Sequence, residues 1–259
     1  MNNNEINGFQ NEKQFCNMLN DKKVKDLNPM LESFISDLYG NLDGDLLIKC
    51  RISYSDKKYD IVLTIDNIDK RISIKKGIKN SVHVEGISSF IHFLIENNIE
   101  RKYVINYLKY HYADGTTNGS GKKRISVDEY KLSHQKEIDE LNKVLNKEEL
   151  LIKAVERFVI KGNISDKEID ALVYGTIYDF YWIKKKDIYK IILYKKDSYS
   201  TAVHFSCLTV QPLDRCLNNN PKYEKRRFCI QIKWYNLIDD IIGNINNKII
   251  EDTNDDNIL

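Results

Sequence analysis

The feature that most constrains this fold is a change in hydrophobic period just after Gly40. Residues 10–40 have a helical character, and the segment NPMLESFISDLYG carries apolar Phe34, Ile35 and Leu38 at a spacing typical of a helix that ends at the glycine. Three short segments rich in Ile and Val follow, with polar turns between them: LLIKCRISY (46–54), YDIVLTI (59–65) and RISIKKG (71–77). These segments predict three strands, so the chain combines helix and sheet.

A second helix and a fourth strand are expected next. In VEGISSFIHFLIENN (84–98) the apolar residues share one helical face, and Glu85 falls in the first turn, on the polar face. The segment KYVINYLKYHY (102–112) alternates and predicts a strand. The order helix, three strands, helix, strand allows one parallel pairing through a crossover.

The clearest break in the chain is ADGTTNGSG (113–121). We therefore expect two domains, 1–112 and 113–259. The second begins with helices over 126–146 and 147–162, continues with strands in TAVHFSCLTVQ and RRFCIQIKWY, and closes with a helix near 236–248. The predicted fold class is mixed α/β: an N-terminal core followed by an α+β module.

Charge and cysteine usage exclude several classes of protein. The 40 Lys and Arg residues nearly balance the 38 Asp and Glu residues, which leaves a net charge of +2 and no global polybasic signal. The N-terminal MNNNEINGFQNEK lacks a basic segment followed by an apolar run, and no window approaches a membrane span, so we expect neither a signal peptide nor membrane contact. The five cysteines are widely spaced and predict reduced thiols in a cytoplasmic protein.

Two neighbouring strands place an acid near a lysine. If Asp66 to Asp69 form the turn, Ile65 lies opposite Lys70 and Asp60 lies opposite Lys75. Hydrolysis of a phosphodiester needs a divalent cation held by oxygen ligands, and a nearby lysine can orient water and stabilise developing charge. An ordinary solvent-exposed ion pair is the alternative interpretation of the same two residues.

The motif Asp60-x12-Ser73-Ile74-Lys75, set in that order of elements, resembles the PD-(D/E)XK (restriction-endonuclease-like) nuclease superfamily over residues 20–112. The segment KYDIVLTIDNIDKRISIKKGIKNSVHVEG is also similar to nuclease-like proteins of phages and mobile elements. Two positions differ from the superfamily pattern. Tyr59 stands where proline is frequent, and Ser73 stands where a second carboxylate is usual.

The resemblance implies a Mg²⁺- or Mn²⁺-dependent DNA endonuclease of restriction, phage defence or a mobile element. In a Ser-x-Lys variant of the superfamily, a glutamate on the following helix replaces the missing carboxylate. Asp60, Glu85 and the Ile74 carbonyl are then the expected metal ligands, Lys75 acts on the attacking water, and Ser73 completes the site. Glu32 on the first helix is a further candidate. The resemblance leaves a homodimer open.

Two segments predict contacts with nucleic acid, DNA or RNA. One is GTTNGSGKKR, and the other is a basic stretch followed by a strand with polar and aromatic side chains outward. The expected binding residues are His83, Lys122, Lys123, Arg124, Arg226, Arg227, Gln231 and Lys233. Gln231-Ile232-Lys233, with Asp214 upstream, also imitates a Gln-x-Lys form of the catalytic motif, in elements of the wrong order.

Two functions of other classes remain open at this point. The first is a nucleic-acid-binding module in which Ser73 marks a decayed nuclease site. The second is a protein-interaction module, which the even balance of charge permits.

Overall fold

The computed structural model describes residues 3–54, 57–77, 80–163 and 167–255, and it is a mixed α/β protein with two sheets. The chain forms two compact units. Unit 1 comprises Met1–Asn80, Val159–Ile191 and Asn236–Leu259, and unit 2 comprises Ser81–Phe158 and Ile192–Tyr235. The division therefore differs from the expected boundary at 112/113, because the chain leaves unit 1 after its third long strand and returns to it later.

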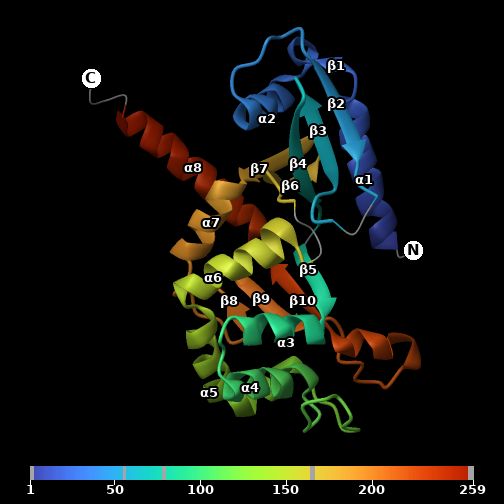
Figure 1. The fold of residues 1–259 in the computed structure, drawn as a ribbon, viewed down its shortest axis with the longest axis vertical. Coiled ribbons are helices and arrows are strands. Elements are labelled where there is room, and N and C mark those ends of the chain that lie inside the picture. Colours follow the sequence, from blue (N-terminus) through green and yellow to red (C-terminus); the bar gives the residue numbers. More distant parts are fainter. Residues whose placement is uncertain (1–2, 55–56, 78–79, 164–166, 256–259) are drawn as a thin grey trace. The chain divides into compact units, whose positions relative to one another are not determined.

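Unit 1 is built on a six-stranded sheet in the order β1-β2-β3-β4-β6-β7 (Figure 1). Its strands are β1 (Lys22–Lys23), β2 (Leu47–Ile52), β3 (Ile61–Ile65), β4 (Ile68–Lys75), β6 (Ala171–Thr176) and β7 (Asp179–Lys184). Its other elements are α1 (Asn3–Leu19), the 3₁₀ turn η1 (Val24–Asp26), α2 (Pro29–Tyr39), α7 (Lys185–Tyr194) and α8 (Leu237–Asp255). The three strands expected from the sequence are confirmed as β2, β3 and β4.

The core of unit 1 lies between one face of this sheet and the helices α1 and α2. Phe15 and Phe34 from these helices pack edge-on against Phe180 of β7. The expected helix ending at Gly40 is confirmed: the Asn28 side chain accepts from the Leu31 N–H at its start, and Gly40 has φ 81° at its end. Burial of this apolar set supplies the main stabilisation of the unit.

The register of the β3–β4 hairpin differs from the expected one by two residues. Ile65 pairs with Ile68 rather than Lys70, so the turn contains only Asp66 and Asn67. Both turn residues are left-handed, with φ values of 47° and 60°, as a two-residue type I′ turn requires. A shift of two keeps every side chain on its expected face, so Asp60 still lies on the face that carries Ser73.

The strand predicted over 102–112 is wrong, because this segment forms helix α4 (Arg101–Tyr112). Its buried residues Val104, Tyr107 and Tyr110 recur every three positions, a helical period that the tyrosine-rich sequence disguised as alternation. The strand that pairs with β4 in parallel is instead β6, which follows unit 2 in the sequence and pairs Ser73 with Leu172.

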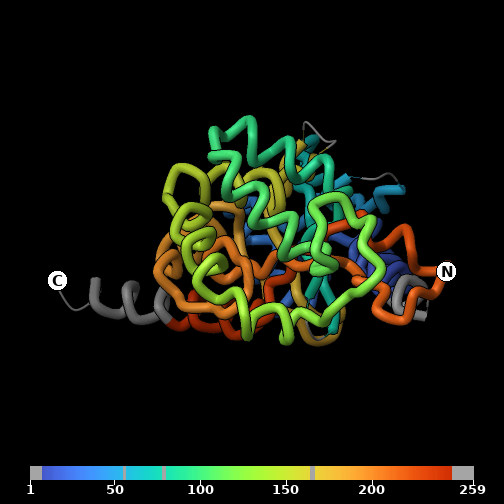
Figure 2. Tube along the Cα trace, turned by 90° about the horizontal axis from the view of Figure 1, so that it is seen from below, coloured from blue at the N-terminus to red at the C-terminus, as the bar shows by residue number. Residues whose placement is uncertain are grey.

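Unit 2 packs helices against a four-stranded sheet in the order β5-β10-β9-β8. The strands are β5 (Asn80–Gly86), β8 (His204–Phe205), β9 (Leu208–Pro212) and β10 (Cys229–Trp234). The helical elements are α3 (Ile87–Glu96), α4, α5 (Val127–Leu145), α6 (Glu148–Val155), the π-helical turn η2 (Glu156–Lys161) and the 3₁₀ helix η3 (Pro221–Phe228). Helix α4 contacts both α3 and α5, as both ribbon and tube views show (Figures 1 and 2).

An aromatic cluster forms the core of unit 2. Phe158 lies 5.0 Å from Phe93 and 5.7 Å from Phe205 between ring centroids, and Phe90 lies 4.7 Å from Tyr107. The pattern expected for β10 is confirmed, since Ile230, Ile232 and Trp234 are all buried. Among the described residues, no helix combines the length and the apolar character that crossing a bilayer demands.

The hairpin turn predicts a stability difference between two substitutions at Asn67. A β-branched residue is strained at positive φ, so Asn67→Val should lower the free energy of unfolding by about 1–2 kcal/mol. Glycine accepts this conformation, so Asn67→Gly should be at least as stable as the wild type. Urea denaturation of the three proteins measures this. An Asn67→Val variant as stable as the wild type would contradict the turn assignment.

Candidate functional site

Asp60 occupies the end of the β3–β4 ladder, where its carboxylate replaces a strand carbonyl. Its own N–H donates to the Ile72 carbonyl at 2.9 Å, which continues the ladder by one step beyond β3. Its Oδ2 then accepts from the Ile74 N–H at 2.5 Å and from the Ser73 hydroxyl at 3.2 Å. The next donor of β4 is therefore bound by a side chain, which fixes the carboxylate against the strand.

Lys75 lies beside this carboxylate. Its Nζ is 3.6 Å from Asp60 Oδ2 and 3.3 Å from the Ile74 carbonyl oxygen, to which it donates a hydrogen bond. The side chains of Lys75 and Asp60 are 20% and 23% exposed, so the pair is less screened than a surface ion pair. The Ile74 carbonyl points to the same edge of β4 as the Ile74 N–H, because both groups of one strand residue face the same neighbour.

A third titratable group, Glu12 of α1, interacts electrostatically with Asp60 and Lys75. Burial raises the pKa of Glu12 to about 7, repulsion by the Asp60 carboxylate adds to this effect, and attraction by Lys75 opposes it. The preceding residue anchors the helix, since the Asn11 side chain donates to the Gly175 carbonyl of unit 1 at 2.9 Å. Glu12 is not among the residues expected from the sequence. The signal available was its position on the helical face that Phe15 and Leu19 share, whereas the candidate Glu32 is exposed.

Glu85, the expected second carboxylate, has its partners in unit 2. It lies on strand β5 rather than in a helix, so its expected place in a first helical turn is wrong. Its side chain is 1% exposed, and its Oε2 binds Arg157 at 2.8 Å and the Ser89 hydroxyl at 3.0 Å. Burial alone would raise the pKa of Glu85, but hydrogen bonds from His83 and Arg157 lower it below the ordinary value. This carboxylate is already neutralised within its own unit.

His83 accompanies Glu85 on β5 and is not a loop residue. Its ring is 8% exposed, lies 3.4 Å from the Glu85 carboxylate and packs 5.3 Å from the Phe158 ring centroid. These contacts give His83 a place in the core of unit 2. A solvent-facing phosphate contact, which the sequence led us to expect, does not fit a side chain so enclosed.

The oxygen atoms around Lys75 fit a hard divalent cation. Asp60 provides a carboxylate and Ile74 a carbonyl, and Glu12, whose charge interacts with Asp60 and Lys75, is a candidate second carboxylate. Oxygen ligands of this kind suit Mg²⁺ or Mn²⁺, which bind through one or two carboxylates and waters. Within the described ranges, no group of three or more His, Cys, Asp or Glu side chains is arranged to enclose a metal ion. The site can thus hold a partly hydrated ion and has no closed cage of protein ligands.

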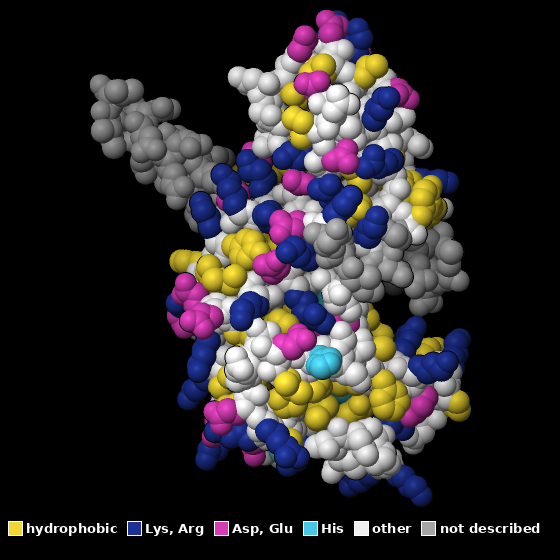
Figure 3. All heavy atoms as spheres, viewed as in Figure 1, with side chains coloured by type: hydrophobic (Ala, Val, Ile, Leu, Met, Phe, Trp, Pro, Cys, Tyr) yellow, Lys and Arg dark blue, Asp and Glu magenta, His cyan; other side chains and the backbone are white. Residues whose placement is uncertain are grey.

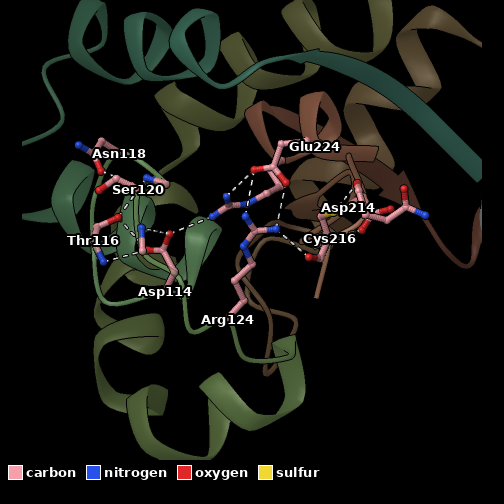
Figure 4. A network of polar contacts seen from close by, with 12 residues as sticks. Asp114, Thr116, Asn118, Ser120, Arg124, Asp214, Cys216 and Glu224 are labelled. Atoms are coloured by element: carbon pink, nitrogen blue, oxygen red, sulfur yellow. Dashed lines mark hydrogen bonds and ion pairs between the residues drawn. The ribbon is translucent and has the colours of Figure 1, made fainter. Parts of the chain in front are cut away.

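Two of the arginines expected to bind nucleic acid are internal to unit 2 (Figure 4). Arg227 is 3% exposed and binds Asp114 at 2.9 Å, and Arg124 is 8% exposed and binds Glu224 at 3.0 Å. Arg227 also donates to Glu224 at 2.8 Å, so these charges form one chain of ion pairs. The expectation that Arg124 and Arg227 contact phosphates is therefore corrected: they join the 113–121 loop to η3.

The joined segments carry further basic residues on their surface. Lys122 and Lys123 are exposed beside the loop, and Lys225 and Arg226 are exposed on η3. Lys and Arg side chains gather over η3 in the space-filling view (Figure 3). Because Arg124 and Arg227 neutralise the two acids between them, the exposed charge here is predominantly positive. We name Lys122, Lys123, Lys225 and Arg226 the basic surface of unit 2.

The residues of the alternative Gln-x-Lys motif have contacts other than one shared site. Gln231 pairs across the sheet with Gln211, and Lys233 lies over the ring of Tyr235. The Asp214 carboxylate accepts from the Cys216 N–H at 2.7 Å in a loop. Each of these polar groups has a local structural partner.

Comparison with known proteins adds no relative: no protein-family model and no curated protein matches the chain. The function is therefore argued from the residues and their geometry.

The raised pKa of Glu12 predicts a pH dependence of stability. Between the ordinary value of 4.5 and about 7, the folded chain keeps a proton that the unfolded chain has released. The free energy of unfolding therefore falls as the pH rises through this window. For a half-buried group, partly screened by solvent, the loss is on the order of 1–2 kcal/mol.

Urea denaturation at about pH 5 and about pH 8, without added metal, measures this loss. Glu12→Gln removes the titrating group and should lose less stability than the wild type over this range. Glu32→Gln, at an exposed position of α2, should behave like the wild type. The same loss in Glu12→Gln and in wild type would show that Glu12 does not titrate in this window.

Proposed function

We propose that this protein is a Mg²⁺- or Mn²⁺-dependent nuclease that hydrolyses phosphodiester bonds in DNA, with its active site in unit 1. The observation that carries the proposal is the convergence of Asp60, Lys75 and the Ile74 carbonyl at the end of one hairpin. The charge of Glu12 interacts with both Asp60 and Lys75. Partly buried charges of both signs around a set of oxygen ligands are typical of a site that handles phosphate.

The topology of unit 1 supports a restriction-endonuclease-like core. An antiparallel run β2-β3-β4 is extended by β6 in parallel, and the acid directly precedes β3 while the lysine ends β4, an arrangement like that of the superfamily motif. A helix, α1, precedes the strands. In this interpretation, unit 2 forms the connection between β4 and β6. The fourth strand of the core therefore comes later in the chain than the expected segment 102–112.

The roles of the residues follow from their chemistry. Asp60, Glu12 and the Ile74 carbonyl would hold the cation, which when bound neutralises phosphate charge and acidifies a water molecule. Lys75 would orient the attacking water and stabilise the negative charge on the phosphoryl oxygens. The Ile74 N–H and the Ser73 hydroxyl keep the Asp60 carboxylate in place. Ser73 thus positions an acidic residue and does not replace one.

Variants of Lys75 test catalysis. Lys75→Ala should lower the rate of Mg²⁺-dependent cleavage of plasmid and linear DNA by about 10²-fold or more. Lys76→Ala is the matched control, because Lys76 is the next residue and is exposed. It should cleave at the wild-type rate.

Equal cleavage by Lys75→Ala and wild type would remove Lys75 from the mechanism. Absence of any cleavage by the wild type, with no Mg²⁺-dependent rise in melting temperature, would favour the alternative of a binding module with a decayed site. A rise in melting temperature that disappears in Asp60→Asn would exclude that alternative.

The basic surface of unit 2 is proposed to hold the phosphate backbone. Its four cations lie on two segments that the ion pairs of Arg124 and Arg227 fasten together, so they form a fixed surface. Arg226 also lies 5.1 Å over the ring centroid of Tyr223, which limits its motion. Contacts of this kind position nucleic acid without reading its sequence.

Salt dependence tests this surface. Replacing both Lys225 and Arg226 by Ala should weaken DNA binding and reduce the slope of log K against log salt by about two, since each phosphate contact contributes about 0.9. A control with Lys136 and Lys143 replaced by Ala removes the same charge from exposed positions on α5. Fluorescence anisotropy at several salt concentrations measures both. Equal slopes for the two double variants would mean that DNA binding depends on the net charge of the protein and not on this surface.

A further inference from the structure

Two cysteines of unit 1 belong to the packing between α1 and β2, and one of them, Cys16, is one helical turn from Glu12. Cys16 lies four residues after Glu12 on α1 and is 7% exposed, and Cys50 lies on β2 and is partly buried. Helix α1 contacts β2, and both cysteines belong to the packing of the same core. The Asn20 N–H donates to the Cys16 carbonyl and the Asn20 side chain accepts from the Cys50 N–H, so both cysteines lie next to Asn20.

The surrounding backbone holds this pair in register. The Cys50 N–H donates to the Asn20 side chain at 2.9 Å, and the Asp21 N–H donates to the Ile48 carbonyl at 2.8 Å. These bonds tie the end of α1 to β2 at Ile48 and at Cys50. The two cysteines therefore keep their relative position while the unit is folded.

The electrostatics of the pair favour reaction at one thiol. The hydrogen bond from Cys50 lowers the pKa of Cys16, although burial and the Glu12 carboxylate oppose this effect. The same hydrogen bond, followed by burial, raises the pKa of Cys50. The thiolate is the nucleophilic form of cysteine. The lowered pKa of Cys16 therefore favours its sulfur as the one that attacks an oxidant.

We propose that Cys16 and Cys50 form a reversible disulfide under peroxide, and that this bond changes the position of Glu12. The Cys16 sulfur attacks one peroxide oxygen, forming a sulfenic acid and releasing the second oxygen as water once the thiol proton is taken up. The Cys50 sulfur then attacks the sulfenic sulfur, forming the S–S bond and releasing a second water. Two thiols and one peroxide thus give one disulfide and two waters, and a dithiol reverses the step.

The disulfide affects the candidate site through α1. A disulfide confines its two Cα atoms to a narrow range, about 4.4–6.8 Å apart, so the bond would constrain the position of α1 on β2. Glu12 is one turn away on the same helix. This consequence rests on the proposed function. The oxidation-dependent bond itself does not.

Peptide mapping after peroxide treatment of the full chain tests the bond directly. Free thiols are alkylated first, and the digest is searched for a peptide pair linking Cys16 to Cys50. Wild type and Cys229→Ser should give this pair, and a dithiol should abolish it. The Cys229 thiol hydrogen-bonds the Lys225 carbonyl in unit 2, so its variant is a matched control. Cys16→Ala and Cys50→Ser should lack the pair. Both variants are tested because replacing the buried Cys16 alters the core, whereas Cys50 is only partly buried.

The Mg²⁺-dependent rise in melting temperature of the reduced and oxidised forms tests the consequence. The oxidised form should bind Mg²⁺ at least about tenfold more weakly. Both thiols remaining alkylatable, or oxidised separately without a linked peptide, would overturn the proposal even if the protein cleaves DNA. A linked peptide with equal Mg²⁺ affinity in both forms would overturn the coupling to Glu12. A linked peptide with no Mg²⁺ response in either form would keep the disulfide and contradict the nuclease.

Discussion

The hydrogen bond from the Ile74 N–H to the Asp60 carboxylate is the constraint on which the candidate site depends. Among the residues that the structure describes, β4 has no further backbone partner on β3 beyond Ile72, and an aspartate side chain takes the place of the missing carbonyl. This exchange draws a negative charge into the edge of the sheet. Lys75 lies 3.6 Å from that charge because it is the next residue along β4, and the pKa of Glu12 is raised partly because the same charge faces it. The replacement of one backbone carbonyl by the Asp60 carboxylate thereby determines the electrostatics of the whole site.

Much of unit 1 could be predicted from local patterns. Helix α2 has an Asn28 cap at its start and Gly40 at its end, and the three Ile- and Val-rich segments form adjacent strands. The face shared by Asp60 and Ser73 was also correct, although the hairpin register was not. A two-residue turn needs two residues at positive φ, and Asp-Asn supplies them less obviously than Asn-Gly, so a longer turn was preferred.

The errors come from contacts between distant parts of the chain. Nothing local marks Ala171–Thr176 as the parallel partner of β4, because its pairing depends on a connection through all of unit 2. Glu85 is the expected type of residue, but its burial beside Arg157 depends on tertiary packing, which a local sequence pattern does not show. Arg124 and Arg227 resembled phosphate ligands because their acidic partners, Glu224 and Asp114, are close in space but 100 and 113 residues away along the sequence. Glu12 was missed because its weakly amphipathic helix precedes the recognisable motif.

The central claim is that Glu12 and Asp60, rather than Glu85, provide the carboxylates of a cation site. Electron paramagnetic resonance titration with Mn²⁺ tests it most directly, because free and bound Mn²⁺ are distinguished without any substrate. The account predicts that wild type and Glu85→Gln bind one Mn²⁺ with similar affinity, while Glu12→Gln binds at least about tenfold more weakly and Asp60→Asn more weakly still. Binding that is lost in Glu85→Gln and kept in Glu12→Gln would contradict it.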